Sequence, residues 1–80
     1  MAAKAFVLIE TAVGRAKEVA VALEKLDGVK SVDAVTGPYD IIVIAEGETL
    51  NDIGDLVTGK IHPISGISRT VTCLAIWSGG

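Results

Sequence analysis

The feature of the sequence that most constrains its fold is a short pattern that occurs twice. The chain reads Leu26-Asp27-Gly28-Val29 in its first half and Ile64-Ser65-Gly66-Ile67 in its second half. Each stretch runs apolar, polar, glycine, branched apolar, and each lies between a helical pattern and a strand pattern. A glycine just past a helix end tolerates the left-handed conformation that stops the helix. We therefore expect two similar halves, each a strand, a helix and a strand.

The first half is predicted to run from Lys4 to Thr36. Residues 4–10 are apolar and branched, which favours a strand. Between Arg15 and Leu26 the apolar residues recur at helical spacing and form one stripe, made of Ala16, Val19, Ala20, Leu23 and Leu26. The segment from Val29 to Thr36 then reads as the second strand.

The second half repeats this order after a Gly-Pro turn. Residues 39–46 are predicted to form the third strand, and Thr49 is a suitable N-cap for the second helix. Pro63 makes continuation of that helix past His62 unfavourable, and Ser68 to Trp77 supplies the last strand. The buried stripe of the second helix is expected to consist of Leu50, Ile53, Val57 and Ile61.

Two such halves joined by a hairpin describe an α+β, ferredoxin-like βαββαβ sandwich with a four-stranded antiparallel sheet and two helices on one face. Right-handed crossovers place the first and third strands in the centre of the sheet. The sequence supports this order, because these two strands are apolar on both faces while the other two are mixed. Since the helices cover only one face, we expect a dimer through the other. A lone 80-residue core is also marginal, with only ~60% of its unfolded surface buried.

The turn Gly37-Pro38-Tyr39-Asp40 is the first place to look for a ligand. Glycine and proline suffice to set a tight turn, so the ring and the carboxylate beside them are available for binding. The Asp40 carboxylate can pair with an amine, while amides around Gly37 can receive a carboxylate, which together suit a zwitterion. The structural alternative is that Tyr39 packs and that Asp40, beside the turn, binds backbone amides.

Composition narrows the function classes. The formal net charge is −3, and the seven basic residues are scattered among acidic ones, which argues against direct contact with nucleic acid.

Cys73 is the single cysteine and is expected to be a small buried hydrophobe. The absence of a second cysteine favours a reducing compartment, the cytoplasm. No stretch is long enough for a membrane span. His62 is the single histidine and has no companions at ligand spacing, so we expect no metal and no cofactor.

The placement of these motifs resembles the effector-binding domain of the Lrp/AsnC family of transcription regulators, also called the RAM domain. The resemblance rests on the Gly-Xaa-Tyr-Asp turn between the second and third strands, on the glycine after each helix, and on the final strand Ile67-Ser68-Arg69-Thr70-Val71-Thr72. It covers about residues 4–77 of a single domain spanning 1–80. Family members commonly carry a helix-turn-helix domain before this one; because the first strand is predicted to begin near Lys4, we expect no such domain in this chain.

The resemblance implies a non-enzymatic sensor of a small molecule, typically an amino acid. It further implies a homodimer built from apposed sheets, a ring-like assembly of dimers, and effectors bound where dimers meet. The site residues carried over from the family are Thr36, Gly37, Tyr39, Asp40, Thr70 and Thr72. Any influence on transcription would then act through assembly with full-length Lrp/AsnC-type regulators.

Three alternatives stay open from the sequence. A small enzyme of the dimeric α+β barrel type shares this topology, and Asp40, His62 and Tyr39 are the only plausible acid–base groups for it. A pure oligomerisation module needs no ligand at all. An ACT-like regulatory domain is a third possibility, although such domains normally accompany a catalytic domain.

Overall fold

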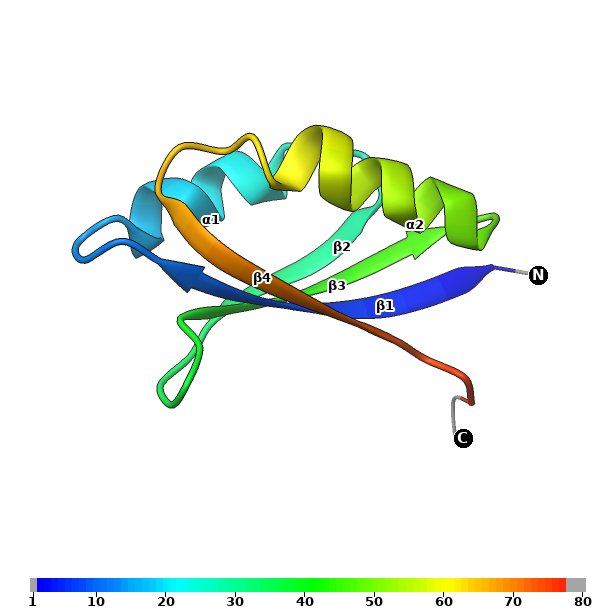
Figure 1. The fold of residues 1–80 in the computed structure, drawn as a ribbon, viewed down its shortest axis with the longest axis horizontal. Helices are drawn as coiled ribbons and strands as arrows, with labels where there is room; N and C mark the ends of the chain where they lie inside the picture. Colours follow the sequence, from blue (N-terminus) through cyan, green and yellow to red (C-terminus); the bar gives the residue numbers. More distant parts are fainter. Residues whose placement is uncertain (1, 78–80) are drawn as a thin grey trace.

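The structure is a computed structural model that describes residues 2–77. Figure 1 shows one layer of helix lying on one layer of sheet, as the two-half pattern of the sequence predicts. The elements in chain order are β1 (Ala3–Thr11), α1 (Ala16–Glu24), β2 (Val29–Ala34), β3 (Ile41–Gly47), α2 (Leu50–Leu56), the π-helical segment η1 (Val57–Ile61) and β4 (Ile67–Leu74).

The four strands form one antiparallel sheet in the order β2-β3-β1-β4. This confirms that the first and third strands are central and the second and fourth are edges. Their register pairs Val7 with Val43 and Ile9 with Ile41, and β4 continues the row with Thr72 and Thr70. Because directly opposed residues of paired strands share a face, these side chains all point toward the helices.

The core lies between the sheet and the two helices. The buried residues come from alternate positions of the central strands and from one side of each helix: Ala5, Val7, Ile9, Val19, Leu23, Ile41, Val43, Ala45, Ile53, Leu56, Val57 and Ile61. None of the buried residues is polar or charged among those that the structure describes. Within that part of the chain, no helix is long and apolar enough to cross a membrane.

The face of the sheet opposite the helices is uncovered and apolar at its centre, and we refer to it as the open face. Its central side chains are Phe6, Leu8, Ile42, Ile44, Val71 and Cys73. Charged residues surround them: Lys4 lies opposite Glu46 at one end, and Arg69 is paired with Glu10 at 3.1 Å at the other. Both faces of the central strands are therefore apolar, as predicted, and only one of them is covered within this chain.

The repeated junction of the sequence is repeated in three dimensions. Gly28 and Gly66 have φ angles of +94° and +102°, in the left-handed region. In each junction the residue after the glycine donates its amide to the apolar residue that begins the pattern, Val29 to Leu26 at 3.3 Å and Ile67 to Ile64 at 3.4 Å. The two loops that return the chain to the sheet are thus built in the same way.

The second helix differs from its prediction in two respects. Thr49 does cap it, and Thr49 and Asp52 form a reciprocal capping box. Leu50, however, is 62% exposed, so its placement in the buried stripe was wrong. The helix also widens into the π-helical segment η1, which the apolar spacing did not indicate.

Several predicted strand ends were too long. β2 ends at Ala34 and not at Thr36, and β3 begins at Ile41 and not at Tyr39, because the hairpin occupies all of residues 35–40. β4 ends at Leu74, so Trp77 lies beyond the sheet and is 83% exposed. The pairing of β4 stops with Ala75, whose amide reaches the Lys4 carbonyl near the start of β1.

Candidate ligand-binding site

The hairpin between β2 and β3 carries four of the six predicted site residues. The Val35 amide donates to the Asp40 carbonyl at 2.9 Å and closes the loop. Gly37 has a φ of +133°, which strongly favours glycine, and a Cβ built on it meets nothing within 4 Å. Thr36 and Gly37 lie at the surface, while Tyr39 is partly buried. The backbone around Gly37 is therefore open to the close approach of a small molecule.

Asp40 is fixed to the neighbouring strand by both its backbone and its side chain. Its amide donates to the Ile9 carbonyl at 2.9 Å, and its carboxylate Oδ2 accepts the Thr11 amide at 2.8 Å. This contact is the backbone-binding role that the sequence left open for Asp40. Within the described residues the second carboxylate oxygen takes no hydrogen bond, and the side chain is half-buried. One oxygen thus positions the carboxylate and the other is free to receive a donor.

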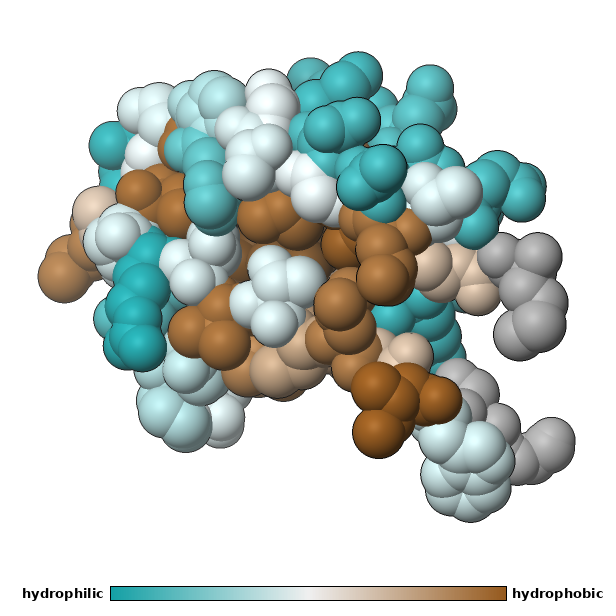
Figure 2. Space-filling view, turned by 45° about the vertical axis from the view of Figure 1, so that its right-hand side comes forward, coloured by the Kyte–Doolittle hydropathy of each residue, from teal (hydrophilic) through white to brown (hydrophobic). Residues whose placement is uncertain are grey.

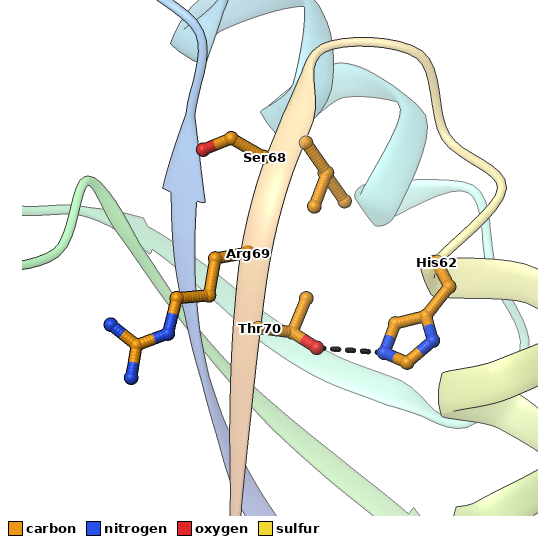
Figure 3. Close-up of a pocket in the computed structure, with 5 residues that line it drawn as sticks. His62, Ser68, Arg69 and Thr70 are labelled. Carbon is orange, nitrogen blue, oxygen red and sulfur yellow. Dashed lines mark hydrogen bonds between the residues drawn. The ribbon is translucent and has the colours of Figure 1, made fainter.

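Thr70 and Thr72 lie elsewhere, on the helix side of β4. They stand opposite Ile9 and Val7, both fully buried under the helices. Thr70 Oγ1 lies 2.7 Å from the His62 Nε2 atom, at the end of the segment that follows α2 (Figure 3). The His62 ring is therefore held against the last strand.

A polar hollow of about 300 Å³ surrounds this pair and is also lined by Ile67, Ser68 and Arg69. Figure 3 shows the side chains of Ser68 and Arg69 turned away from His62. Both reach Glu10 instead, the Ser68 hydroxyl donating to its carbonyl and the Arg69 guanidinium to its carboxylate, each at 3.1 Å. The imidazole and the Thr70 hydroxyl are therefore the side-chain polar groups that face the hollow.

A second hollow of about 250 Å³ continues along β4, and we refer to it as the α2–β4 groove. Its lining is mostly apolar and consists of Leu50, Ile53, Gly54, Val57, Thr58, Thr72 and Leu74. The Thr58 hydroxyl already donates to the Gly54 carbonyl at 2.8 Å, which leaves the Thr72 hydroxyl as the free polar group of the lining. Figure 2 shows apolar side chains gathered on the side of the molecule where α2 begins and the described chain ends.

The predicted site residues thus fall into two groups within one copy of the chain. Thr36, Gly37, Tyr39 and Asp40 lie at the hairpin, whereas Thr70 and Thr72 lie along β4 with β1 between the two groups. No hairpin residue lines either hollow beside β4. The sequence did not reveal His62 or the groove as parts of this surface. The only available signal was the shared face of Thr70, Thr72 and Leu74 on an edge strand.

The prediction for Cys73 was wrong. It is exposed on the open face, where it lies opposite Phe6, and is not a buried hydrophobe. The alternation along β4 places Thr70 and Thr72 on the helix side and Cys73 on the other. Among the residues that the structure describes, no three His, Cys, Asp or Glu side chains are grouped so that they could hold a metal ion.

Comparison with known proteins matches almost the whole chain to one protein family. The family model described as the Lrp/AsnC ligand binding domain matches residues 4–78. An uncharacterised HTH-type transcriptional regulator of Pyrococcus furiosus is 34% identical over 59 residues, which cover 74% of this chain and 39% of that protein. The chain therefore spans about two fifths of the length of the curated relatives it matches.

Two solved structures resemble the chain over nearly their whole length. The protein TTHA0845 from Thermus thermophilus superposes with a TM-score of 0.92 at 33% identity, covering 98% of both chains. The hypothetical protein PHS023 from Pyrococcus horikoshii gives a TM-score of 0.87 at 38% identity, covering 98% of this chain and 93% of the other.

Proposed function

The chain belongs to the Lrp/AsnC ligand-binding domain family, and on that premise we propose that it is a non-enzymatic, oligomeric domain that senses an amino acid. We further propose that it influences transcription or metabolism by assembling with full-length regulators of the family. A net charge of −3 supports a role without direct DNA contact. The arginines Arg15 and Arg69 also pair with Glu18 and Glu10, which leaves them less available to phosphates.

The observation that carries this proposal is the Asp40 carboxylate beside the open backbone of Gly37. One carboxylate oxygen is held by the Thr11 amide, so the group is positioned before a ligand arrives. A charge-assisted hydrogen bond from an ammonium group to the other oxygen is a strong contact of the kind that fixes an amino acid. Because Thr70 and Thr72 face a different side of the same copy, they join this site only if a neighbouring copy supplies them.

The open face supports the oligomeric part of the proposal. An apolar centre surrounded by charged residues is typical of a protein–protein interface. A second copy packed against the sheet would bury this apolar centre.

The experiment is a thermal-shift and native-mass screen of the full chain against the proteinogenic amino acids, with Asp40→Asn as the matched variant. Asparagine keeps an oxygen for the Thr11 amide but loses the charge. We expect at least one amino acid to raise the melting temperature of the native protein, since a ligand at 100 times its Kd adds ~2.7 kcal/mol. We expect Asp40→Asn to bind that amino acid at least tenfold more weakly than the native protein.

Two results would contradict the proposal in different ways. If no amino acid changes the melting temperature or the mass of the native protein, the sensing role is wrong and a pure oligomerisation module is the better description. If Asp40→Asn binds the same amino acid equally well, the role of Asp40 as the amine acceptor is wrong. A turnover screen with Asp40→Asn and a His62→Gln variant then tests the dimeric α+β barrel enzyme.

A further inference from the structure

We infer that the residues directly after β4 form an arm that holds a second copy of this chain. This segment runs from Ala75 to Trp77, and we refer to it as the apolar arm. Its side chains Ile76 and Trp77 pack against the partner copy at the rim of the open face. The inference rests on the oligomeric part of the proposed function and adds to it the segment that closes the interface.

Two large apolar side chains stand next to each other in the apolar arm, and the described chain leaves both of them in water. Ile76 is 100% exposed and Trp77 is 83% exposed. A lone exposed apolar residue is common, but exposed apolar residues that adjoin one another mark interaction surfaces. Tryptophan is also one of the residues that contribute most to binding at protein interfaces. The apolar arm therefore has the composition of a contact segment.

The apolar arm leaves the sheet on the side of the open face. Figure 1 shows the last described residues, in red, on the side of the sheet away from the helices. Just before the arm begins, β4 contributes Val71 and Cys73 to the open face. The Ala75 amide donates to the Lys4 carbonyl at 2.9 Å, which fixes the start of the arm at the edge of the sheet. The arm therefore continues the open face and turns away from the α2–β4 groove of its own copy.

The hairpin projects on the same side of the sheet as the apolar arm, at the opposite end (Figure 1). The hairpin is tied to the end of β1 by the bond from Asp40 to Ile9, whereas the arm is tied to Lys4 near the start of β1. The apolar centre of the open face thus lies between two projections. A second copy suits this shape, because its own open face supplies an equally apolar centre. A two-fold axis then lets each copy give the arm contact that it also receives.

The apolar arm is long enough to reach the partner copy. Two extended residues beyond Ala75 span about 7 Å, and apposed sheets pack about 10 Å apart, so the indole ring of Trp77 can meet the partner at the rim of the interface. A tryptophan side chain buries about 150–250 Å². Two symmetric arms would supply about a quarter of the roughly 1,600 Å² of a standard interface. Loss of this contact should therefore change the dissociation constant of the dimer measurably.

The first test follows the fluorescence of the full chain, in which Trp77 is the single tryptophan. Emission spectra and acrylamide quenching are measured over a dilution series, with the mass of the protein measured in parallel by light scattering. We expect the emission to shift to the red and the quenching to increase as the dimer dissociates. Ile44→Lys, which puts a charge at the centre of the open face, should show the red-shifted, readily quenched emission at every concentration. Should Ile44→Lys fail to fold, the diluted native protein gives the same comparison.

The second test compares the dissociation constants of variants of the full chain by sedimentation equilibrium. Trp77→Ser should weaken dimerisation at least tenfold, because it removes the ring from the interface. Trp77→Phe keeps an apolar ring and should stay within threefold of the native protein. Val21→Ser is the control, since Val21 is an exposed apolar residue on α1, away from the sheet, and should stay within twofold.

The outcomes separate this inference from the proposed function. A native dimer in which acrylamide reaches Trp77 as readily as in the monomer overturns the inference and leaves the assembly intact. Protected emission that does not change on dissociation shows that the apolar arm packs on its own copy, which overturns the inference as well. So does a Trp77→Ser protein that dimerises as tightly as the native one. If the native chain is a monomer at every concentration, the oligomeric part of the proposed function itself fails.

Discussion

At the scale of single residues, Asp40 combines a structural contact with a candidate binding group, and the two are separable. Asp40→Ala removes the acceptor of the half-buried Thr11 amide, and we expect it to lower the free energy of unfolding by about 1–2 kcal/mol. Asp40→Asn retains an acceptor, so we expect its stability to stay within about 0.5 kcal/mol of the native protein. Urea denaturation measures both changes. Equal losses in the two variants would show that the charge, and not the hydrogen bond, stabilises the hairpin.

Gly66 is a second position where one residue determines local structure. Its φ of +102° is unfavourable for any residue with a Cβ, and a Cβ built there lies 2.9 Å from Val19 Cγ2 and 3.2 Å from Arg15 Cβ. We expect Gly66→Ala to lower the free energy of unfolding by about 2 kcal/mol, from strain and from crowding together.

Gly59→Ala is the control for Gly66→Ala. Gly59 lies in η1, and its Cβ would meet nothing within 4 Å. We expect this replacement to be neutral or to stabilise the protein by up to about 1 kcal/mol, because alanine is the better helix former. Thermal denaturation followed by circular dichroism distinguishes the two variants, and a Gly66→Ala protein as stable as Gly59→Ala would show that a Cβ at position 66 is accommodated without strain or crowding.

Residue roles could be predicted from the sequence where local chemistry determines them. The left-handed conformations of Gly28 and Gly66 could be predicted, because each glycine lies where a helix is expected to stop. Thr49 could be predicted as an N-cap because its hydroxyl can accept a backbone amide of the first turn. The contact between His62 and Thr70 could not be predicted, because it crosses a loop and depends on how η1 ends. Cys73 was misplaced because an edge strand with mixed polarity does not reveal which of its faces meets the helices.

At the scale of elements, α2 depends on its first turn, because glycines at 54 and 59 weaken the remainder of the helical segment. The Thr49 hydroxyl accepts the Asp52 amide at 3.2 Å, and the Asp52 carboxylate accepts the Thr49 amide at 3.0 Å. We expect Thr49→Ala to lower the free energy of unfolding by about 1 kcal/mol. Thr58→Ala, which removes a hydroxyl from the same helical segment without touching the cap, should cost less. Chemical denaturation of both variants checks the order, and a larger loss in Thr58→Ala would refute it.

The π-helical segment η1 could not be predicted from the spacing of the apolar residues. Ile53, Val57 and Ile61 are spaced by four, and in a regular α-helix such residues drift around the helix by about 40° at each step. The wider turn, in which the His62 amide donates to the Val57 carbonyl at 2.9 Å, keeps Val57 and Ile61 buried and brings His62 toward β4. Spacing alone predicted these three buried residues correctly but not the kind of helix that buries them.

At the scale of the whole molecule, the order of the strands and the two layers follow from the duplicated pattern and from the apolar faces of the central strands. The candidate site could not be predicted from these patterns. Its residues lie on two surfaces of one copy, so a pattern along one chain cannot show whether they meet. The assembly that we propose would use the open face of the sheet, which no part of this chain covers.

The open face gives the prediction that tests assembly directly. Ile44 lies at its centre, opposite Phe6, and a lysine there would put a charge into the proposed interface. We expect the native chain to be a dimer or a multiple of one, and Ile44→Lys to be a monomer. We also expect a lower melting temperature for Ile44→Lys, because association at the open face would stabilise so small a domain. Val21→Lys is the matched control, since Val21 is 46% exposed on α1, away from the sheet.

Native mass spectrometry and light scattering over a range of concentrations measure this difference. The melting temperature of the native protein and of Val21→Lys should rise with protein concentration, as mass action requires when the folded state is the associated one. That of Ile44→Lys should not. A folded Ile44→Lys protein with the native mass would place the interface elsewhere, and the groove beside β4 with the apolar residues Ile76 and Trp77 would then be the next surface to alter.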